Sequence, residues 1–587
     1  MALEVNQHVT RLRRYQPFHP DSSELIYEQS NPDEATYAMK AERFLDQCLK
    51  DPSISLIILT GDAGHGKTSL SAAALKNLGM TGKEAATAVE SLGDASAPIA
   101  RTPNGRALWL FSDLSNVSVE EATQVLLRLL EPTDGGVAIV CANEGRLRAA
   151  VANDNSGQLS AVTQTLEDGI KTGSVTSADP SMVVLNLNYQ SVAPDDGGGL
   201  VDWALKTWVT DKRRWSVCAK CDARNDCPIL ANHLALSDVT KGPRRVSAFR
   251  DLLATVEKSG QVITTRQALA LVAHAITGGI SCRDVHRMHA PNGDDMGWQF
   301  PYLYHQALFG GDLTREQRRS VAPFAALRRL DPALVALRSV DDRLDPDSVD
   351  DTFLPPVPSS DGATPHSRRE AQRESKIVRG LIAYLRRSSY FDAPESERME
   401  RMGLRAGRWF TEICKGADDV PVGIRDTLLR GLEAVQGIYR PANVPDFLIL
   451  DPAFFANRSR AAVIARQLRG RNVRIVSQEE QWRMVSEHDP SLPRAVDWSN
   501  RSVVARIDTN DQVLSMDLSL MAFELLVRWA EGLSSRVQHE SEIRRIAGVL
   551  AALVPSDETD EDINVLVGGE RRTLTIDIGD LIRSGGA

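Results

Sequence analysis

The sequence lacks the features that would place it in a membrane or make it a globally basic nucleic-acid-binding protein. No window holds 18 uncharged apolar residues, so no membrane-spanning helix is expected. The first residues, Met1–Asn6, lack the charged and apolar blocks of a signal peptide. Basic residues number 68 against 78 acidic ones, which gives a formal net charge of -10. Local basic patches remain compatible with this balance, because binding depends on how charge is distributed.

Cysteine is also scarce. Seven cysteines in 587 residues do not make a disulfide framework. Three of them fall within residues 218–227, a spacing that suits a reducing compartment and a metal site better than disulfides. We therefore expect a cytoplasmic protein.

Four short apolar runs without polar alternation indicate strands buried on both faces of a parallel sheet. Segments with helical spacing of apolar residues lie between and around these runs. This alternation predicts a doubly wound α/β domain. The predicted strands are 55–59, 107–111, 137–142 and 182–187, and the clearest predicted helices are 34–49, 69–78, 118–130 and 262–276.

The length of the chain predicts two to four domains. Beyond the α/β domain, a helical lid, a linker rich in proline, aspartate and serine, a helical region and a mixed α+β region are expected. The C-terminal region includes predicted strands at 446–450 and 503–507, a helix at 519–533 and a strand pair around Gly568-Gly569. The predicted segments are 1–50 (N-terminal helical), 51–198 (α/β core), 199–340 (cysteine-containing insertion and helical lid), 341–367 (linker), 368–440 (helical) and 441–587 (α+β).

A phosphate-binding loop follows the first predicted strand. The pattern G-x-x-x-x-G-K-[ST] is met by Gly61, Gly66, Lys67 and Thr68. Glycines let backbone N–H groups face the phosphates, Lys67 would neutralise the β- and γ-phosphates, and Thr68 would supply an oxygen to Mg²⁺. The pattern therefore predicts binding of ATP or GTP with Mg²⁺. The expected nucleotide contacts are Gly61, Asp62, Ala63, Gly64, His65, Gly66, Lys67, Thr68 and Ser69.

Polar residues end the next two predicted strands. Asp113 is placed to hold the Mg²⁺ hydration shell, or alternatively to cap the following helix. The glutamate that commonly follows such an aspartate is missing, because Leu114 comes next. Asn143 is placed to orient water or the γ-phosphate, and Glu144 is the candidate general base.

Three arginines are further candidates for the site. Arg146 and Arg148 would stabilise transition-state charge in their own site or in a neighbouring subunit's, or are solvated helix residues. Arg266 opens a predicted helix of the lid, where it is either a second sensor of the nucleotide or an ordinary surface arginine.

The cysteine cluster predicts a metal site. Cys218, Cys221 and Cys227 are spaced C-x₂-C-x₅-C, and His233 is the expected fourth ligand of a zinc ion. Cys282, His286 and His289 are alternative fourth ligands, an iron–sulfur cluster is an alternative group, and free thiols packed in a loop are the simplest alternative.

Taken together, these segments resemble an AAA+ type P-loop ATPase. More narrowly, the sequence resembles the ATPase of bacterial DNA-phosphorothioation-dependent restriction systems, which defend cells against phage. The resemblance implies an ATP-hydrolysing motor or switch in an oligomeric complex with nuclease or helicase partners that acts on DNA. It is carried by Gly61 to Thr68, Ser112 to Ser115, Ala142 to Arg148 and Cys218 to Ile229.

Two other functions remain open. The missing glutamate after Asp113 favours a signalling scaffold that binds nucleotide with little hydrolysis, and a small-molecule kinase is the third candidate. The basic stretches 212–215 and 466–474 are candidate DNA-phosphate contacts or solvated faces.

Overall fold

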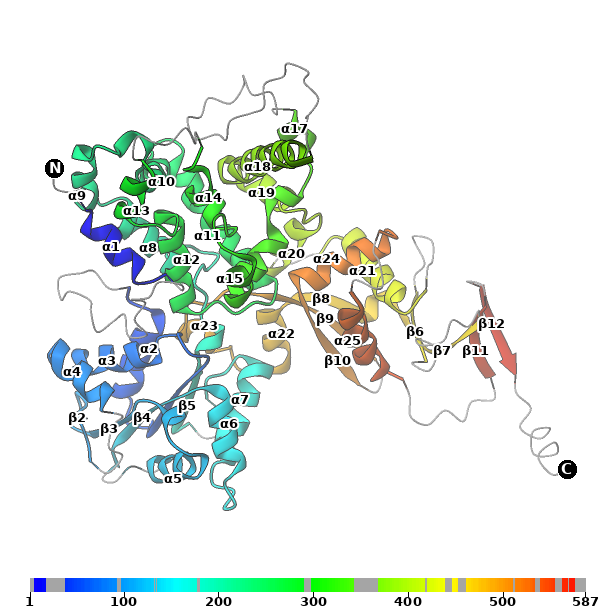
Figure 1. The fold of residues 1–587 in the computed structure, drawn as a ribbon. Coiled ribbons are helices and arrows are strands. Elements are labelled where there is room, and N and C mark those ends of the chain that lie inside the picture. The colour runs from blue at the N-terminus through cyan, green and yellow to red at the C-terminus, as the bar shows by residue number, and fades with distance from the viewer. Residues whose placement is uncertain are drawn as a thin grey trace. The chain divides into compact units, whose positions relative to one another are not determined.

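A computed structural model of the chain shows a mixed α/β architecture (Figure 1). No helix among the residues it describes is long and apolar enough to cross a membrane. The chain divides into two compact units: unit 1 comprises 1–257, 261–403 and 485–499, and unit 2 comprises 258–260, 404–484 and 500–587. The described residues are 5–16, 37–91, 97–130, 132, 135–176, 180–289, 297–342, 368–416, 420–438, 446–451, 461–509, 512–533, 539–554, 562–567 and 570–575.

Unit 1 contains a five-stranded sheet with the strand order β2-β3-β4-β1-β5. All four predicted strands form, and they pair in parallel, whereas the short β2 joins the edge antiparallel. The elements are α1 (Gln7–Arg13), α2 (Lys40–Lys50), β1 (Leu56–Thr60), α3 (Lys67–Asn77), α4 (Gly82–Glu90), β2 (Ala100–Arg101), β3 (Ala107–Phe111), α5 (Val119–Leu130), β4 (Val137–Ala142), α6 (Glu144–Ala152), α7 (Ser160–Thr172) and β5 (Met182–Asn186).

The strands are buried on both faces, which explains their unbroken apolar sequences. Alternate residues such as Ile58 and Val140 form a core with α5, α6 and α7 on one face. On the opposite face, α3 packs against β4, where Ser71 Oγ lies 3.3 Å from Cys141 Sγ.

The strand order produces a topological switch point at the carboxyl edge of this sheet. The connection leaving β1 leads to β2 and β3, beyond β4, whereas the connection leaving β4 leads to β5, beyond β1. Where connections leave adjacent parallel strands in opposite directions, the loops part and ligands commonly bind. The fold therefore favours a binding site between the ends of β1 and β4.

The rest of unit 1 is helical. The prediction for α12 is confirmed in detail, because Thr264 and Gln267 form a capping box and Gly278, with φ +62°, ends the helix. The predicted linker lies almost wholly outside the described residues. The helices are α8 (Leu200–Val209), α9 (Lys212–Trp215), α10 (Pro228–Ser237), α11 (Gly242–Lys258), α12 (Thr265–Thr277), α13 (Cys282–Met288), α14 (Tyr304–Ala307), α15 (Arg315–Ser320), α16 (Ala322–Leu327), α17 (Arg338–Asp341), α18 (Arg368–Asp392), α19 (Glu395–Arg401) and α23 (Leu492–Ala495).

A segment that is late in the sequence, 485–499, packs within unit 1. The Asp497 carboxylate accepts hydrogen bonds from Tyr37 Oη at 2.9 Å and from Gln190 Nε2 at 2.7 Å. The Asp497 carbonyl also accepts from the Ser191 N–H. Residues from three distant parts of the sequence thus meet beside the end of β5.

Unit 2 has two antiparallel sheets, β10-β9-β8 and β12-β11-β7-β6. The predicted strands at 446–450 and 503–507 and the predicted strand pair at the C-terminal end are confirmed, although Gly568 and Gly569 lie outside the described residues. The elements are α20 (Gly407–Cys414), α21 (Val422–Val435), β6 (Asp446–Leu450), β7 (Ala461–Arg469), β8 (Val473–Ser477), α22 (Gln478–Val485), β9 (Ser502–Asp508), β10 (Val513–Ser519), α24 (Leu520–Ala530), α25 (Glu540–Ala551), β11 (Asp562–Val567) and β12 (Glu570–Thr575).

Helices α21 and α24 form the centre of unit 2. A Cβ at Gly431 of α21 would lie 2.3 Å from the Leu526 carbonyl of α24, so only glycine permits this approach. The buried Glu524 of α24 accepts the backbone N–H groups of Arg405 and Ala406. These contacts fix the chain where it enters unit 2.

Candidate functional site at the carboxyl edge of the parallel sheet

The phosphate-loop sequence forms a tight turn between β1 and α3. Gly61, Gly64 and Gly66 have φ values of +132°, +95° and +84°, a region that strongly favours glycine. A Cβ at Gly64 would also lie 3.0 Å from Thr264 Oγ1. Both the backbone conformation and the neighbouring side chain therefore require glycine at position 64.

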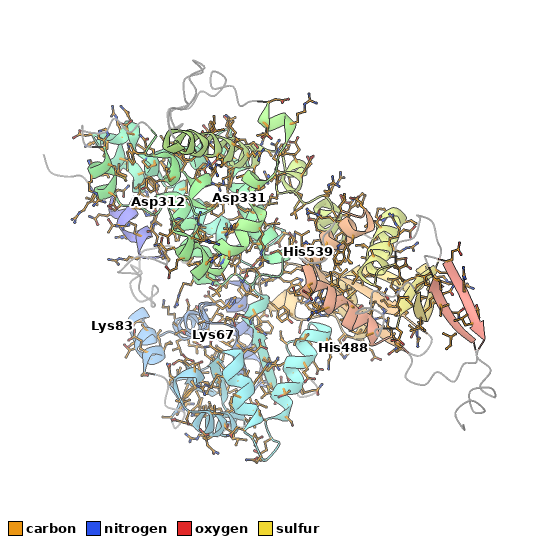
Figure 2. All side chains as sticks on the ribbon, turned by 45° about the vertical axis from the view of Figure 1, so that its right-hand side comes forward. Lys67, Lys83, Asp312, Asp331, His488 and His539 are labelled. Carbon is orange, nitrogen blue, oxygen red and sulfur yellow. The ribbon has the colours of Figure 1, made fainter. Side chains whose placement is uncertain are left out.

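Lys67 is nearly buried under this loop, at the edge of the sheet that faces the helical part of unit 1 (Figure 2). Its Nζ donates to the Gly61 carbonyl at 2.7 Å, to the Asp62 carbonyl at 3.0 Å and to Asn143 Oδ1 at 2.9 Å. Burial lowers the pKa of Lys67, while the neighbouring side chains of Cys141, Asp113 and Asp62 act in the opposite direction. The ammonium group thus joins the end of β1 to the end of β4.

The other predicted loop residues surround this lysine. Thr68 and Ser69 begin α3 and are partly exposed, whereas Asp62 and Ala63 are exposed and His65 is buried. Asp113 follows β3, and its carboxylate accepts the Ser115 N–H at 2.8 Å. Asp113 therefore caps a short turn, as the alternative interpretation expected, and it also acts electrostatically on Lys67.

Asn143 and Glu144 begin α6, directly after β4. Glu144 Oε1 accepts from Arg148 at 2.8 Å, and its Oε2 accepts from Asn186 Nδ2 at 3.2 Å. Glu144 is thus held between its own helix and the end of β5.

Asn188 is a site residue that sequence analysis did not identify. Its Oδ1 accepts the N–H of Asp62 at 2.8 Å, and its Nδ2 lies 3.5 Å from Glu144 Oε2. Asn188 therefore connects the phosphate loop to Glu144. The available signal was its position just after the fourth apolar run, the equivalent of Asn143 after the third.

The predicted arginines occupy different positions. The N–H of Arg266 donates to the Gly64 carbonyl at 3.1 Å, and Thr265 Oγ1 lies 3.4 Å from the His65 carbonyl. The first turn of α12 thus contacts the phosphate loop. Arg146 is half-buried on α6, and Arg148 is engaged by Glu144.

The two basic stretches lie in different units. Residues 212–215 form α9, where Arg213 and Arg214 pair with Asp211. In unit 2, the predicted basic stretch lies on β7, β8 and the turn between them, and Arg474 pairs with Asp508.

Cysteines gather at a second location in unit 1. Cys218, Cys221, Cys227 and Cys282 line one small cavity together with His286. Among the described residues, no three His, Cys, Asp or Glu side chains already stand in the arrangement of a metal site. His233, the expected fourth ligand, does not line the cavity, because its ring stacks on Trp215 with centroids 4.3 Å apart. Burial there lowers the pKa of His233 to about 4.

His289 is also occupied elsewhere, since its Nδ1 lies 3.0 Å from Asp226 Oδ2. Of the residues considered as a fourth ligand, Cys282 and His286 are therefore those that the fold brings to the three clustered cysteines.

Comparison with protein-family models, with curated proteins and with solved structures finds no match to this chain.

Proposed function

We propose that this chain is an Mg²⁺-dependent ATPase of the P-loop type, with an AAA+ like arrangement in which the helices around α12 act as a lid. The observation that supports it best is the position of Lys67 beside three positive-φ glycines, where its ammonium group joins the end of β1 to the end of β4. An ammonium group and inward-facing backbone N–H groups at a helix N-terminus are the chemistry that recognises phosphates.

The residues present suit a Mg-nucleotide. Thr68 and Asp113 would hold Mg²⁺, which when bound neutralises charge on the phosphates. Lys67 would exchange its carbonyl partners for the β- and γ-phosphates, which offer a stronger charge-assisted interaction.

In the proposed reaction, Glu144 takes a proton from the attacking water as the water oxygen bonds to the γ-phosphorus and the bond to ADP breaks. Asn143 orients the water or the γ-phosphate. Arg266 and Arg146 stabilise the developing charge, Arg266 from α12 and Arg146 in its own site or in a neighbouring subunit's. Two observations support these roles: Asn143 and Glu144 directly follow β4, and the Arg266 N–H contacts the Gly64 carbonyl of the phosphate loop.

The resemblance to the ATPase of DNA-phosphorothioation-dependent restriction systems suggests a biological role for this activity. We infer that the chain is the motor or switch subunit of a cytoplasmic, oligomeric anti-phage restriction complex that acts on DNA with a nuclease or helicase partner. All seven cysteines are free of disulfides, which suits a reducing compartment.

One observation favours the alternative of a nucleotide-bound scaffold with little hydrolysis. The carboxylate of Glu144 is engaged by Arg148 and Asn186, and no second glutamate follows Asp113. If Glu144 keeps these partners when nucleotide binds, hydrolysis will be slow.

The decisive experiment compares wild type with Lys67→Ala in Mg-ATP binding and in ATP turnover, with and without DNA. Removing the ammonium group is expected to lower turnover on the order of 10²-fold or more and to abolish measurable binding. Lys76→Ala is the matched control, because Lys76 is an exposed lysine of the same helix.

Each outcome has a distinct meaning. Wild-type binding without turnover would support the scaffold, and a lack of stimulation by DNA would count against the DNA motor. Failure of the wild type to bind Mg-ATP or Mg-GTP would contradict the whole proposal.

A further inference from the structure

Four thiols from separate parts of the sequence surround one cavity in unit 1. Cys218 lies in the 3-10 turn Ser216–Lys220, Cys221 follows that turn, Cys227 is the N-cap of α10 and Cys282 is the first residue of α13. All four line a cavity of ≈ 20 Å³, which is large enough for a single water-sized particle. Cys282 is separated from the other three by more than 50 residues of sequence, so the tertiary fold brings it to the cavity.

The lining of the cavity combines these four sulfur atoms with the imidazole of His286. Apolar side chains such as Val9, Ile229 and Val285 complete it. Thiolates are the ligands that structural zinc prefers, and an apolar shell controls the access of water to such a site.

Nitrogen atoms already surround the sulfur atoms. Asn6 Nδ2 donates to Cys218 Sγ at 3.2 Å, and the Leu230 N–H donates to Cys227 Sγ at 3.5 Å. His286 Nε2 lies 3.4 Å from Cys221 Sγ. Donors directed at sulfur stabilise metal-bound thiolates and orient them, and here they come from three different elements.

We propose that Cys218, Cys221, Cys227 and Cys282 bind one zinc ion through four thiolates. An all-sulfur tetrahedral set suits structural zinc. On binding, four S–H groups lose their protons to solvent and four Zn–S bonds form, so the site carries a net charge of −2. The side chains do not hold this geometry as they stand, so metal binding would require changes of rotamer among the four cysteines.

His286 is assigned as a donor to Cys221 and not as a ligand. It lies one turn after Cys282 on α13, and its ring nitrogen contacts the sulfur itself. The ion would thereby fasten three segments together: the chain before α1 through Asn6, the segment from α9 to α10, and α13. This role is structural and goes beyond the proposed ATPase activity.

The test measures zinc and iron in the purified full-length chain and zinc affinity by competition with a chelating dye. One zinc and no iron per chain are expected. Cys282→Ala is expected to bind zinc at least about 100-fold more weakly, since it removes a ligand, and His286→Ala about 10-fold more weakly with one zinc retained. Cys414→Ala is the control, because Cys414 is a buried cysteine of unit 2.

Thiol alkylation of the wild type keeps the proposal testable if Cys282→Ala does not fold. Removing zinc from the native chain should expose up to four additional reactive thiols, and re-adding zinc should protect them again. The proposal is overturned if neither purified nor zinc-treated protein holds zinc, if iron and sulfide are found instead, if Cys282→Ala binds zinc like wild type, or if zinc removal leaves thiol reactivity unchanged. None of these readouts depends on ATP binding, so failure here is distinguishable from failure of the ATPase proposal.

Discussion

Unit 1 contains both the phosphate loop and the cavity lined by Cys218, Cys221, Cys227 and Cys282, called the thiol cavity below. The two sites are built in opposite ways. The loop is one contiguous segment whose backbone is shaped by glycines and whose lysine already has hydrogen-bond partners. The cavity is assembled by side chains from distant segments, whose sulfur atoms meet donors such as Asn6 Nδ2 but do not already stand in the arrangement of a metal site. A site made of backbone is therefore prepared in advance, whereas a site made of side chains depends on its ligand for its final geometry. The following predictions test this contrast.

The largest effect is expected for Glu144→Gln. The amide cannot accept the proton of the attacking water, so ATP turnover should fall on the order of 10²-fold or more while ATP binding is kept. Single-turnover hydrolysis together with equilibrium binding measures the two effects separately. Glu167→Gln, at an exposed glutamate of α7, should behave like wild type. Equal turnover for Glu144→Gln and wild type would remove Glu144 as the base.

A smaller effect is expected for Gly64→Ala. Positive φ costs an alanine about 1 to 3 kcal/mol, and the new Cβ would press on Thr264 and Arg266. Nucleotide affinity should fall on the order of 10-fold, as measured by isothermal titration, while zinc content stays at one per chain.

Gly79→Ala is the matched control, because Gly79 has nearly the same φ, +97°, but nothing lies within 4 Å of its Cβ position. It should lose stability without losing nucleotide affinity. An equal loss of affinity in both variants would show that the loop is not specifically shaped for phosphate.

Asn6→Ala tests the thiol cavity from outside the proposed ligand set. Loss of the donor to Cys218 should weaken zinc binding about 10-fold and leave ATP turnover unchanged. Gln7→Ala, at the exposed next residue, serves as the control. Unchanged zinc affinity in Asn6→Ala would show that Asn6 does not support the ion.

The smallest effect is expected on ATP affinity at the phosphate loop when zinc is removed from the thiol cavity. Two sites without shared contacts are energetically additive, so ATP affinity should change by no more than about twofold. The thermal unfolding temperature of the chain should nevertheless fall, because the ion stabilises only the folded state. A large loss of ATP affinity would show that the two sites are coupled through α12 and its neighbours.

The same contrast explains what the sequence could predict. Unbroken apolar runs marked β1, β3, β4 and β5 because both faces of a parallel sheet are buried, and the loop pattern placed Lys67. Strands β7, β8 and β10 were not predicted, because exposed polar residues such as Arg474 break their sequences into runs too short to be recognised as buried strands.

Contacts that arise only from tertiary folding could not be predicted. The contact of Arg266 with Gly64 depends on how α12 packs, and local spacing alone favoured His233 over the distant Cys282. The roles of Asn186 and Asn188 became visible only when β5 was placed beside β1.

The return of segment 485–499 to unit 1 has a practical consequence for dissecting this protein. A fragment that stops at residue 403 contains the whole parallel sheet but loses Asp497, and with it the acceptor shared by Tyr37 and Gln190. Such a fragment would expose surface that the intact chain covers. A faithful minimal version of unit 1 must carry the segment 485–499 on an engineered connection.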